Sequence, residues 1–344
     1  MASHRRPQQP KRAYPTVFAA TAAALALSSQ TAQADPLPDP TKKGVRAQVD
    51  RLYEQATQAT ETYNGANEKQ KTLRKQADNL QDGVARGQEE LNSLRNSLGS
   101  VASAQYRGGG LDPSLQLLLS AEPDDYLDKA SNLERVSSRQ VNLLQQAQVK
   151  QRALDQQRRQ ATDKLEDLAE VRTELAAKKR LIQGKLAEAQ RLLNTLSAEE
   201  RSKMAEEEQR ADRNSERADL GNETSASSRG AAAFAAAKSR VGMPYVWGAS
   251  GPNSFDCSGL TSWAFQQAGV SIPRTSQQQA NVGTRINSLD DLRPGDLILM
   301  RTDLSHVGFY AGNGQILHSP KPGASVRYES IARSGMPFMW GVRL

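Results

Sequence analysis

Two long stretches of the chain repeat apolar or small residues at alternating spacings of four and three. The first runs from Val45 to Val101 and the second from Tyr126 to Leu196, and the positions between the repeats are mostly Gln, Lys, Arg and Glu. A seven-residue repeat sustained in a polar background is typical of coiled coils. The pattern therefore predicts two long helices that pack through their apolar seams.

A segment rich in helix breakers joins the two stretches. Residues 107–113 read Arg-Gly-Gly-Gly-Leu-Asp-Pro, and glycine and proline at this density end a helix. Because the stretches have similar lengths, folding back into an antiparallel hairpin buries both seams within one chain. An intermolecular coil is the alternative, since polar residues interrupt the second seam.

The predicted hairpin tip, about residues 107–123, contains a short apolar run. Leu117, Leu118 and Leu119 lie there, between two prolines. Little else can cover such a run at the end of a hairpin. It either caps the last turn of the coil or forms a docking surface for a partner, and the pattern is compatible with both.

The first 34 residues have the features of a secretory signal peptide. Four basic residues precede an apolar run over residues 17–27, and Ala32-Gln33-Ala34 forms a small-residue cleavage motif. A retained membrane anchor is the alternative, but the run is shorter than the roughly 20 residues that span a bilayer. We expect cleavage after Ala34 and a secreted, cell-wall-associated protein.

A different pattern begins after the second helix. Residues 216–230 are rich in Gly, Ser, Asn, Thr and Ala, which predicts a flexible linker. Short elements follow: helices over 231–241 and from Cys257 to Ala268, and strands over 296–300, 306–311, 315–318, 325–328 and 340–344. The predicted domains are a signal peptide (1–34), a coiled-coil hairpin (35–215), the linker (216–230) and an α+β domain with an antiparallel sheet (231–344).

Composition and charge support an elongated, exported protein. The 344 residues are 37% hydrophobic and 5% aromatic, which is too lean for one large core. Without the basic signal segment, about +3 of the +7 net charge remains, and the domain from residue 231 is itself cationic. A basic exported domain suits an anionic polymer such as a bacterial envelope, and we expect no nucleic-acid partner. An ordinary solvated basic surface would give the same balance.

The candidate chemistry rests on one cysteine and two histidines. Cys257 is the sole cysteine of the chain, and His306 and His318 are its only histidines after the signal segment. A thiol hydrolase needs a nucleophile, an imidazole base and a group that orients the imidazole. Cys257 begins a predicted helix, where backbone N–H groups and the helix dipole favour the thiolate. An inert buried cysteine is the competing interpretation.

The two histidines are expected to meet across a hairpin. The Gly312-Asn313 turn lies midway between them, which predicts His306 opposite His318 to within one residue of register. Opposite residues of an antiparallel pair share a face of the sheet. One ring can therefore orient the other.

Several sequence blocks make the C-terminal part similar to the NlpC-type cell-wall peptidases, which are papain-like thiol hydrolases. The blocks are Pro244-Tyr245-Val246-Trp247-Gly248, Phe255-Asp256-Cys257-Ser258-Gly259-Leu260, Pro273-Arg274-Thr275-Ser276 with Gln279, Leu292-Arg293-Pro294-Gly295-Asp296-Leu297 and Ser305-His306-Val307-Gly308. The resemblance implies a small papain-like α+β domain preceded by the long coiled-coil hairpin. It implies no metal and no cofactor.

The resemblance also implies roles for individual residues. Cys257 would be the nucleophile, His306 the general base and His318 the orienting group. Tyr245 would line the site near the oxyanion position. Asp256, Ser258 and Arg274 would shape the substrate groove.

The implied substrate is the stem peptide of peptidoglycan, cut at the amide between γ-D-glutamate and diaminopimelate. The coiled coil resembles those of exported wall hydrolases that act in cell separation. Some of these are activated by a membrane complex at the division site, and some occlude their own active site until then. Both mechanisms are hypotheses for this chain, with the Leu117–Leu119 tip as the docking surface.

Three other functions are consistent with parts of the sequence. One cysteine and two histidines could hold zinc with water in the fourth position, as in a zinc-dependent amidase. A non-catalytic module could bind or space wall peptides. Acyl transfer to lipid on a related scaffold would require an apolar groove or anchor, and the C-terminal sequence has neither.

Overall fold

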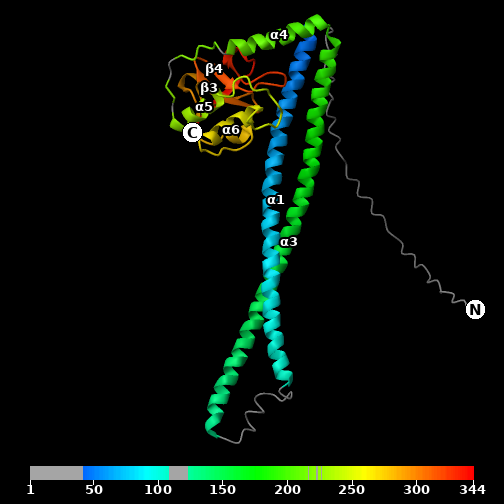
Figure 1. Ribbon diagram of the computed structural model, residues 1–344, viewed down its shortest axis with the longest axis vertical. Coiled ribbons are helices and arrows are strands. Elements are labelled where there is room, and N and C mark those ends of the chain that lie inside the picture. The colour runs from blue at the N-terminus through cyan, green and yellow to red at the C-terminus, as the bar shows by residue number, and fades with distance from the viewer. Residues whose placement is uncertain (1–41, 108–122, 216, 222–223, 226) are drawn as a thin grey trace, which may run out of the picture. The chain divides into compact units, whose positions relative to one another are not determined.

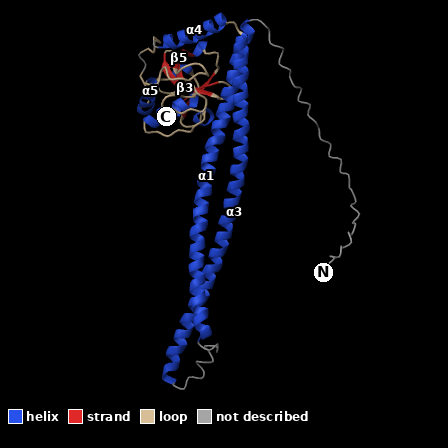
Figure 2. Ribbon diagram, turned by 45° about the vertical axis from the view of Figure 1, so that its right-hand side comes forward, coloured by secondary structure: helices blue, strands red, loops and turns tan. Residues whose placement is uncertain are grey.

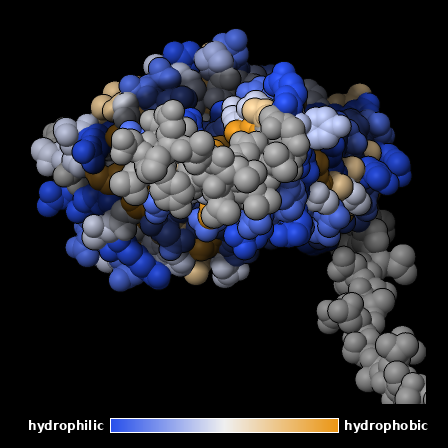
Figure 3. All heavy atoms as spheres, turned by 90° about the horizontal axis from the view of Figure 1, so that it is seen from below, coloured by the Kyte–Doolittle hydropathy of each residue, from blue (hydrophilic) through white to orange (hydrophobic). Residues whose placement is uncertain are grey.

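The computed structural model describes residues 42–107, 123–215, 217–221, 224–225 and 227–344. The predicted signal peptide and the Leu117–Leu119 run lie outside the described residues. Among the helices that are described, none is both long enough and apolar enough to cross a membrane. The face of the molecule shown in Figure 3 is mostly hydrophilic, with small apolar patches.

Two long helices form the predicted antiparallel hairpin. They are α1 (Lys42–Arg107) and α3 (Pro123–Thr195), and they lie side by side in both ribbon views (Figures 1 and 2). Val49 and Leu52 of α1 pack with Ala189 of α3, near the start of one helix and the end of the other. A second cluster joins α1 and α3 further along the pair, through Ala66, Leu73, Ala77, Leu168, Val171 and Leu175. The heptad pattern therefore predicted the pairing correctly.

A separate helix, α4 (Ala198–Ser215), follows the hairpin. It begins with a reciprocal cap: the backbone N–H of Glu200 donates to Ser197 Oγ at 3.2 Å, and the N–H of Ser197 donates to Glu200 Oε2 at 2.9 Å. This cap explains why the helix restarts where the heptad pattern fades. The far end of α4 contacts the C-terminal domain, since Ser215 Oγ accepts from the N–H of Tyr328 at 2.6 Å.

The C-terminal domain is built on a six-stranded antiparallel sheet with the order β1-β6-β2-β3-β4-β5. The strands are β1 (Thr284–Ile286), β2 (Leu297–Met300), β3 (His306–Gly312), β4 (Gln315–His318), β5 (Arg327–Ser330) and β6 (Phe338–Arg343). The helices are α5 (Ser228–Lys238), α6 (Cys257–Gln267) and α7 (Ser276–Gln279), with short 3₁₀ turns at Leu289–Asp291 and Ile331–Arg333. Figure 2 shows the strands gathered within this domain.

One core cluster joins the helices to the sheet. Phe265 of α6 stacks on Phe309 of β3 with ring centroids 5.6 Å apart, and Phe234 of α5 contacts the same ring at 6.0 Å. Leu260 and Leu297 are fully buried in this cluster. The packing fixes α6, and with it Cys257, against the central strands.

The strand predictions were correct in order and approximate in their ends. β5 begins two residues later than expected and β6 two residues earlier. β1 was missed, because three residues at a sheet edge with a single buried position leave almost no alternating pattern. Within the predicted linker, Leu220 packs against the domain core.

The register of the β3–β4 hairpin corrects one prediction. The turn residues are Asn313 and Gly314, since Gly312 pairs with Gln315, so the hairpin is centred later in the chain than expected. An irregularity between Tyr310 and Gly312 moves the pairing back by one residue, so that Tyr310 pairs with Ile316 and Phe309 with Leu317. His318 therefore lies opposite Gly308, and His306 is its diagonal neighbour. Because a shift of two residues keeps both side chains on one face, the histidines still meet.

Candidate active site

Cys257 is the first residue of α6, as the sequence predicted. The helix begins there because the Asp256 side chain accepts a hydrogen bond from the N–H of Gly259 at 2.7 Å, which caps the free end. The Cys257 side chain is 1% exposed and carries a free thiol. Its Sγ lies 3.8 Å from the carbonyl oxygen of Ser305, the residue before His306. The thiol and the first histidine are thus brought to the same place.

A line of hydrogen bonds runs through the two histidines to a carboxylate. His306 Nε2 lies 2.8 Å from His318 Nδ1, and His318 Nε2 lies 3.0 Å from Glu329 Oε2 on the neighbouring strand. An ionised carboxylate only accepts, so His318 donates from Nε2 and its Nδ1 is free to accept from His306 Nε2. With both rings neutral, His306 Nδ1 then holds a lone pair. That nitrogen is buried with no hydrogen-bond partner, and it is the one available for a proton.

The charge of Glu329 is stabilised by its surroundings. Burial by itself would raise the pKa of Glu329, but the hydrogen bond from His318 and the nearby charges of His318, Arg327 and Lys321 lower the pKa to about 2. Glu329 was not among the residues predicted from the sequence. Its position on β5, directly beside β4, is the signal that could have found it once the strand order was known.

The thiol and its base are both held in their neutral forms. Burial, followed by the negative charges of Glu61 and Asp256, raises the pKa of the Cys257 thiol well above its ordinary value, although backbone N–H groups of Ser258 and Val307 act in the opposite direction. Burial, His318 and Arg301 lower the pKa of His306 well below its ordinary value. The thiolate that the helix start was expected to favour is therefore disfavoured in this arrangement.

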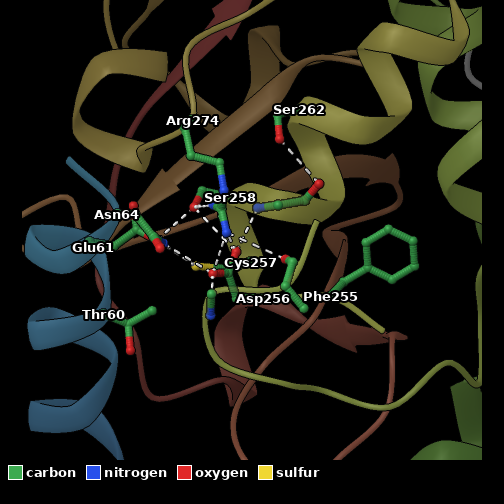
Figure 4. A network of polar contacts seen from close by, with 12 residues as sticks. Thr60, Glu61, Asn64, Phe255, Asp256, Cys257, Ser258, Ser262 and Arg274 are labelled. Atoms are coloured by element: carbon green, nitrogen blue, oxygen red, sulfur yellow. Dashed lines mark hydrogen bonds and ion pairs between the residues drawn. The ribbon is translucent and has the colours of Figure 1, made fainter. Parts of the chain in front are cut away.

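Asp256, Ser258 and Arg274 form one polar cluster beside Cys257 (Figure 4). Both Asp256 oxygens accept from Arg274, at 3.0 and 2.7 Å, and Arg274 also donates to Ser258 Oγ at 2.8 Å. The N–H of Gly248 donates to Asp256 Oδ2 at 2.9 Å. Three residues predicted to shape the groove thus lie together, and Asp256 also fixes the loop that precedes α6.

Tyr245 is buried close to the thiol. Burial, followed by the charges of Cys257 and Asp256, raises the pKa of Tyr245 well above its ordinary value, while a hydrogen bond with Thr57 of α1 opposes the shift. The phenol is therefore protonated and can act as a donor. Its partner in this arrangement comes from the hairpin, which sequence reasoning did not anticipate.

Another unanticipated residue, Glu61 of α1, reaches the nucleophile itself. Glu61 Oε1 lies 3.7 Å from Cys257 Sγ and accepts from Ser258 Oγ at 2.6 Å. Its other oxygen accepts from the backbone N–H and the hydroxyl of Ser276, at 2.7 and 3.0 Å. The side chain is 1% exposed, and Figure 4 shows it projecting from α1 into the polar cluster. Glu61 thus fills the space in front of Cys257.

Neighbouring turns of α1 add further contacts on the same helix face. Asn64 Nδ2 donates to Asp256 Oδ2 at 3.1 Å, and Tyr63 packs edge-on against Trp247 with centroids 5.4 Å apart. About two turns before Glu61, Glu54 pairs with Arg301 at 2.7 Å, and one turn before that, Asp50 pairs with Lys321 at 2.9 Å. Positions 50, 54, 61 and 64 follow helical spacing, so one face of α1 contacts the domain over residues 50–64.

The sequence around Glu61 carries a signal for this contact. Between Glu54 and Glu68 it is the only charged residue, and Ala, Thr, Gln and Asn fill most other positions. Residues 68–95 of the same helix, by contrast, carry many charges. A helix segment stripped of Lys and Arg is suited to packing against another surface, and Thr60 and Asn64 are indeed buried there.

Glu61 titrates abnormally in this position. Burial raises the pKa of Glu61 from 4.5 to about 7, and the negative charge of Asp256 adds to the increase. Hydrogen bonds from Ser258 and Ser276 and the positive charge of Arg274 act in the opposite direction but do not cancel it. The contact is therefore most favourable when Glu61 is protonated.

The histidine geometry argues against the zinc alternative. His306 Nε2 and His318 Nδ1 face each other at 2.8 Å, which leaves no room for an ion between them. Within the described part of the chain, no group of three or more His, Cys, Asp or Glu side chains is arranged to hold a metal ion.

Residues 242–342 match the NlpC/P60 family. A probable endopeptidase of Corynebacterium glutamicum is 47% identical over 118 residues, which are 34% of this chain and 55% of that protein. The probable endopeptidase p60 of Listeria monocytogenes is 43% identical over 110 residues, 31% of this chain and 21% of p60. This chain thus spans about half the length of the first relative and less of the second.

A solved structure, the NlpC/p60 domain of the peptidoglycan hydrolase SagA, is 35% identical and aligns with 33% of this chain and 98% of that domain, with a TM-score of 0.31. Each of these three similarities covers between 31% and 34% of this chain.

Proposed function

Because the C-terminal domain of this chain belongs to the NlpC/P60 family of cysteine peptidases, we propose that the protein is a secreted peptidoglycan endopeptidase kept inactive by its own helix α1. The bond cut is the amide between γ-D-glutamate and diaminopimelate in wall stem peptides, and the enzyme acts in wall remodelling or cell separation. The observation that carries the proposal has two parts: the Cys257 thiol lies 3.8 Å from the carbonyl oxygen of the residue before His306, and His306, His318 and Glu329 form one hydrogen-bonded line.

The catalytic cycle begins with proton transfer. His306 Nδ1 takes the proton from Cys257 Sγ, and the thiolate attacks the amide carbonyl carbon. The N–H groups at the start of α6 and the Tyr245 hydroxyl stabilise the oxyanion that forms. His306 then gives its proton to the leaving amine, which leaves a thioester on Cys257.

Hydrolysis of the thioester completes the cycle. His306 takes a proton from water, the hydroxide attacks the thioester carbonyl, and the proton returns to the departing thiolate. His318 and Glu329 hold the His306 ring in its tautomer and stabilise the imidazolium that forms in each half of the cycle. No cofactor takes part.

Helix α1 blocks this cycle in two ways. Glu61 fills the space in front of Cys257 where a scissile carbonyl must lie, and it accepts from Ser258 and Ser276, two donors of the groove. Its charge and the burial that α1 imposes also raise the pKa of the Cys257 thiol, which suppresses the thiolate. Activity therefore requires that α1 move away from the site.

The hairpin supplies the means of moving α1. A membrane complex at the division site that binds the tip, through Leu117, Leu118 and Leu119, would displace the helix and confine activity to that location. Substitution of these leucines by charged residues tests this part of the proposal in cells. Normal cell separation by such a variant would argue against docking through the tip.

The deciding experiment is mass spectrometry of fragments released from purified walls. The full mature chain, its Glu61→Ala variant and a Glu61→Ala/Cys257→Ala variant are compared. Glu61→Ala is expected to release fragments that end at γ-D-glutamate, and the double variant none. Fragments with other ends, or release without Cys257, would overturn the proposed function.

A further inference from the structure

Three carboxylates and two cations gather where helix α4 meets strand β5. Glu208 and Asp212 of α4 accept from Arg327 Nη1, at 2.7 and 3.2 Å. Arg327 Nη2 lies 3.5 Å from Glu329 Oε2, and Lys321 pairs with Glu208 at 3.1 Å. The Arg327 side chain is only 6% exposed, so water screens its charge weakly. The catalytic cycle uses Glu329 and gives the other four residues no role.

Arg327 is the direct cross-strand neighbour of His318. The two residues are opposite each other in the β4–β5 register, and opposite residues of an antiparallel pair share a face of the sheet. Glu329 is two residues further along β5, so it lies on the same face, and it accepts from His318 Nε2 at 3.0 Å. Arg327 therefore borders both the orienting histidine and the carboxylate that fixes it.

Helix α4 is held to the domain by buried contacts. Its last residue, Ser215, is buried and accepts from the N–H of Tyr328, the residue between Arg327 and Glu329. Towards the hairpin, Glu207 of α4 pairs with Arg46 of α1, and both of these side chains are half-exposed. Such a pair contributes little to stability. Because α3 ends at Thr195 and α4 begins at Ala198, movement of the hairpin need not carry α4 with it.

The net charge beside His318 depends on α4. When α1 moves away, it takes Asp50 from Lys321, but three carboxylates still face two cations, so the cluster is negative. Without α4, Glu329 alone would face Arg327 and Lys321, and the cluster would be positive. A nearby negative charge stabilises an imidazolium, and a positive charge destabilises it. Because each half of the catalytic cycle forms an imidazolium, loss of α4 would slow both halves.

We propose that α4 is part of the catalytic unit and that Arg327 is a positioning residue, which acts through Glu329 on the histidine pair. Glu208 and Asp212 hold Arg327 and compensate its charge. Arg327 in turn supports Glu329 against His318 without destabilising the imidazolium. The inference rests on the proposed function and adds to it that the hairpin moves alone, by a bend between α3 and α4.

A clamp that only fastens α4 to the domain would use the same contacts. The two roles differ in the pH dependence of turnover, because a clamp sets stability and leaves the charge near the histidines unimportant. The charged and titratable groups around the histidine pair come from three places, namely Cys257 of α6, Arg301 after β2, and Arg327 and Glu329 of β5. Cys257, Arg301 and Glu329 stay unchanged in every variant below.

The test measures kcat and KM against pH on a synthetic stem peptide that contains γ-D-glutamyl-diaminopimelate. All variants are made in the full mature chain with Glu61→Ala, so that Glu61 does not occupy the site. Glu208→Gln/Asp212→Asn should lower kcat by at least about fivefold, because hydrogen bonds between charged groups are lost, and should change KM less than about twofold. The acid limb of its kcat profile should move to lower pH, since the charge of Arg327 is left uncompensated.

Arg327→Gln should move the acid limb in the opposite direction. Three carboxylates then face Lys321 alone, which stabilises the imidazolium and shifts the limb to higher pH, while kcat falls because Glu329 loses its support. Glu208→Gln and Asp212→Asn, measured singly, should each shift the limb to lower pH by less than the double variant, which decides the sign even where Arg327→Gln does not fold. Glu206→Gln, at an exposed acid of α4, is the matched control and should behave like the Glu61→Ala chain.

The outcomes separate this inference from the proposed function. If the double variant unfolds at a lower temperature but keeps the kcat and the acid limb of the Glu61→Ala chain, α4 is only a clamp and the inference is wrong, whereas the proposed function stands. Shifts in the same direction for Arg327→Gln and the α4 variants would also overturn it. If the Glu61→Ala chain does not cleave the peptide at all, the proposed function fails and this inference fails with it.

Discussion

Glu61 and Cys257 are 196 residues apart in the chain, yet Glu61 Oε1 lies 3.7 Å from the Cys257 thiol. A carboxylate beside a cysteine raises the energy of the thiolate and occupies the approach to it. The acid is not part of the catalytic domain and comes from the first turns of the hairpin. This pairing ties the state of the hairpin to the chemistry of the domain, and the predictions below follow from it and from its surroundings.

Removal of the Glu61 side chain should activate the enzyme. Glu61→Ala deletes the bonds to Ser258 and Ser276 and the charge beside Cys257, so the closed state loses several buried hydrogen bonds. We expect at least a tenfold faster reaction of Cys257 with iodoacetamide, from bonds worth about 1 kcal/mol or more each. Glu89→Ala, an exposed acid further along α1, is the control and should react like wild type. Equal rates for Glu61→Ala and wild type would contradict the occlusion.

Self-inhibition should weaken as pH rises. In the closed state, with α1 on the domain, the pKa of Glu61 is raised from 4.5 to about 7. Protonation of Glu61 therefore stabilises the closed state fully below about pH 4.5, and this stabilisation is lost as pH rises through about 7. The groups that face this carboxyl are Asp256, Arg274 and Cys257. We expect the activity of wild type relative to Glu61→Ala to increase between about pH 5 and pH 8.

Glu61→Gln separates this effect from titration of the thiol. Glutamine is neutral at every pH and can still accept from Ser276, so it resembles the protonated acid. Its activity relative to Glu61→Ala should stay low and flat over the same range. If the activity of Glu61→Gln relative to Glu61→Ala rises with pH as steeply as that of wild type, protonation of Glu61 does not control the self-inhibition.

Glu329 should act as a positioning residue for the histidine pair. Glu329→Gln keeps an acceptor for His318 Nε2 but loses the charge that stabilises the imidazolium. We expect kcat to fall by at least about tenfold, because the charge that stabilises the imidazolium during turnover is lost, with KM little changed. The measurement compares Glu61→Ala with Glu61→Ala/Glu329→Gln, so that Glu61 does not occupy the site in either chain.

The tautomers themselves can be observed by ¹H–¹⁵N NMR of the full chain, which has only three histidines. Both His306 and His318 should carry their proton on Nε2 in wild type. Glu329→Ala should allow the other tautomer of His318. A proton on His306 Nδ1 in wild type would refute the assignment, because that nitrogen must accept from Cys257.

Asp256 should be important for stability as well as for the site. Asp256→Ala removes the cap of α6 and leaves Arg274, with 12% of its side chain exposed, without its carboxylate. Breaking a buried ion pair from one side costs about 3–5 kcal/mol. Thermal unfolding of this variant should therefore begin well below that of wild type, whereas Asp290→Ala, at an exposed acid in the same domain, should unfold like wild type.

The sequence predicted best the features that depend on residues close to one another in the chain. Heptad spacing predicted α1 and α3, and the position of Cys257 before an apolar run predicted the start of α6. The hairpin brought His306 and His318 to one face, but its turn is Asn313-Gly314 rather than Gly312-Asn313, so the expected register was wrong. The irregularity near Ala311 moves the pairing back by one residue, and it depends on how strands fit the whole sheet, which residue spacing does not reveal.

Contacts between distant elements were beyond sequence reasoning. Glu329 becomes significant only because β5 lies beside β4. Glu61 becomes significant only because one face of α1 packs on the domain, and the heptad pattern describes a different face of the same helix. The thiol consequently has a raised pKa, although its place at a helix start suggested the reverse.

In the proposed function, the inhibitory helix α1 and the enzyme domain are segments of one chain, joined through α3 and α4. Displaced α1 therefore remains at a high effective concentration near the cleft, so contacts that are individually modest suffice for rebinding. When the displacing force ends, the site closes again without proteolysis and without synthesis of a new inhibitor. Under this proposal, the enzyme would be active for as long as α1 is held away, and the return of α1 would end each period of activity.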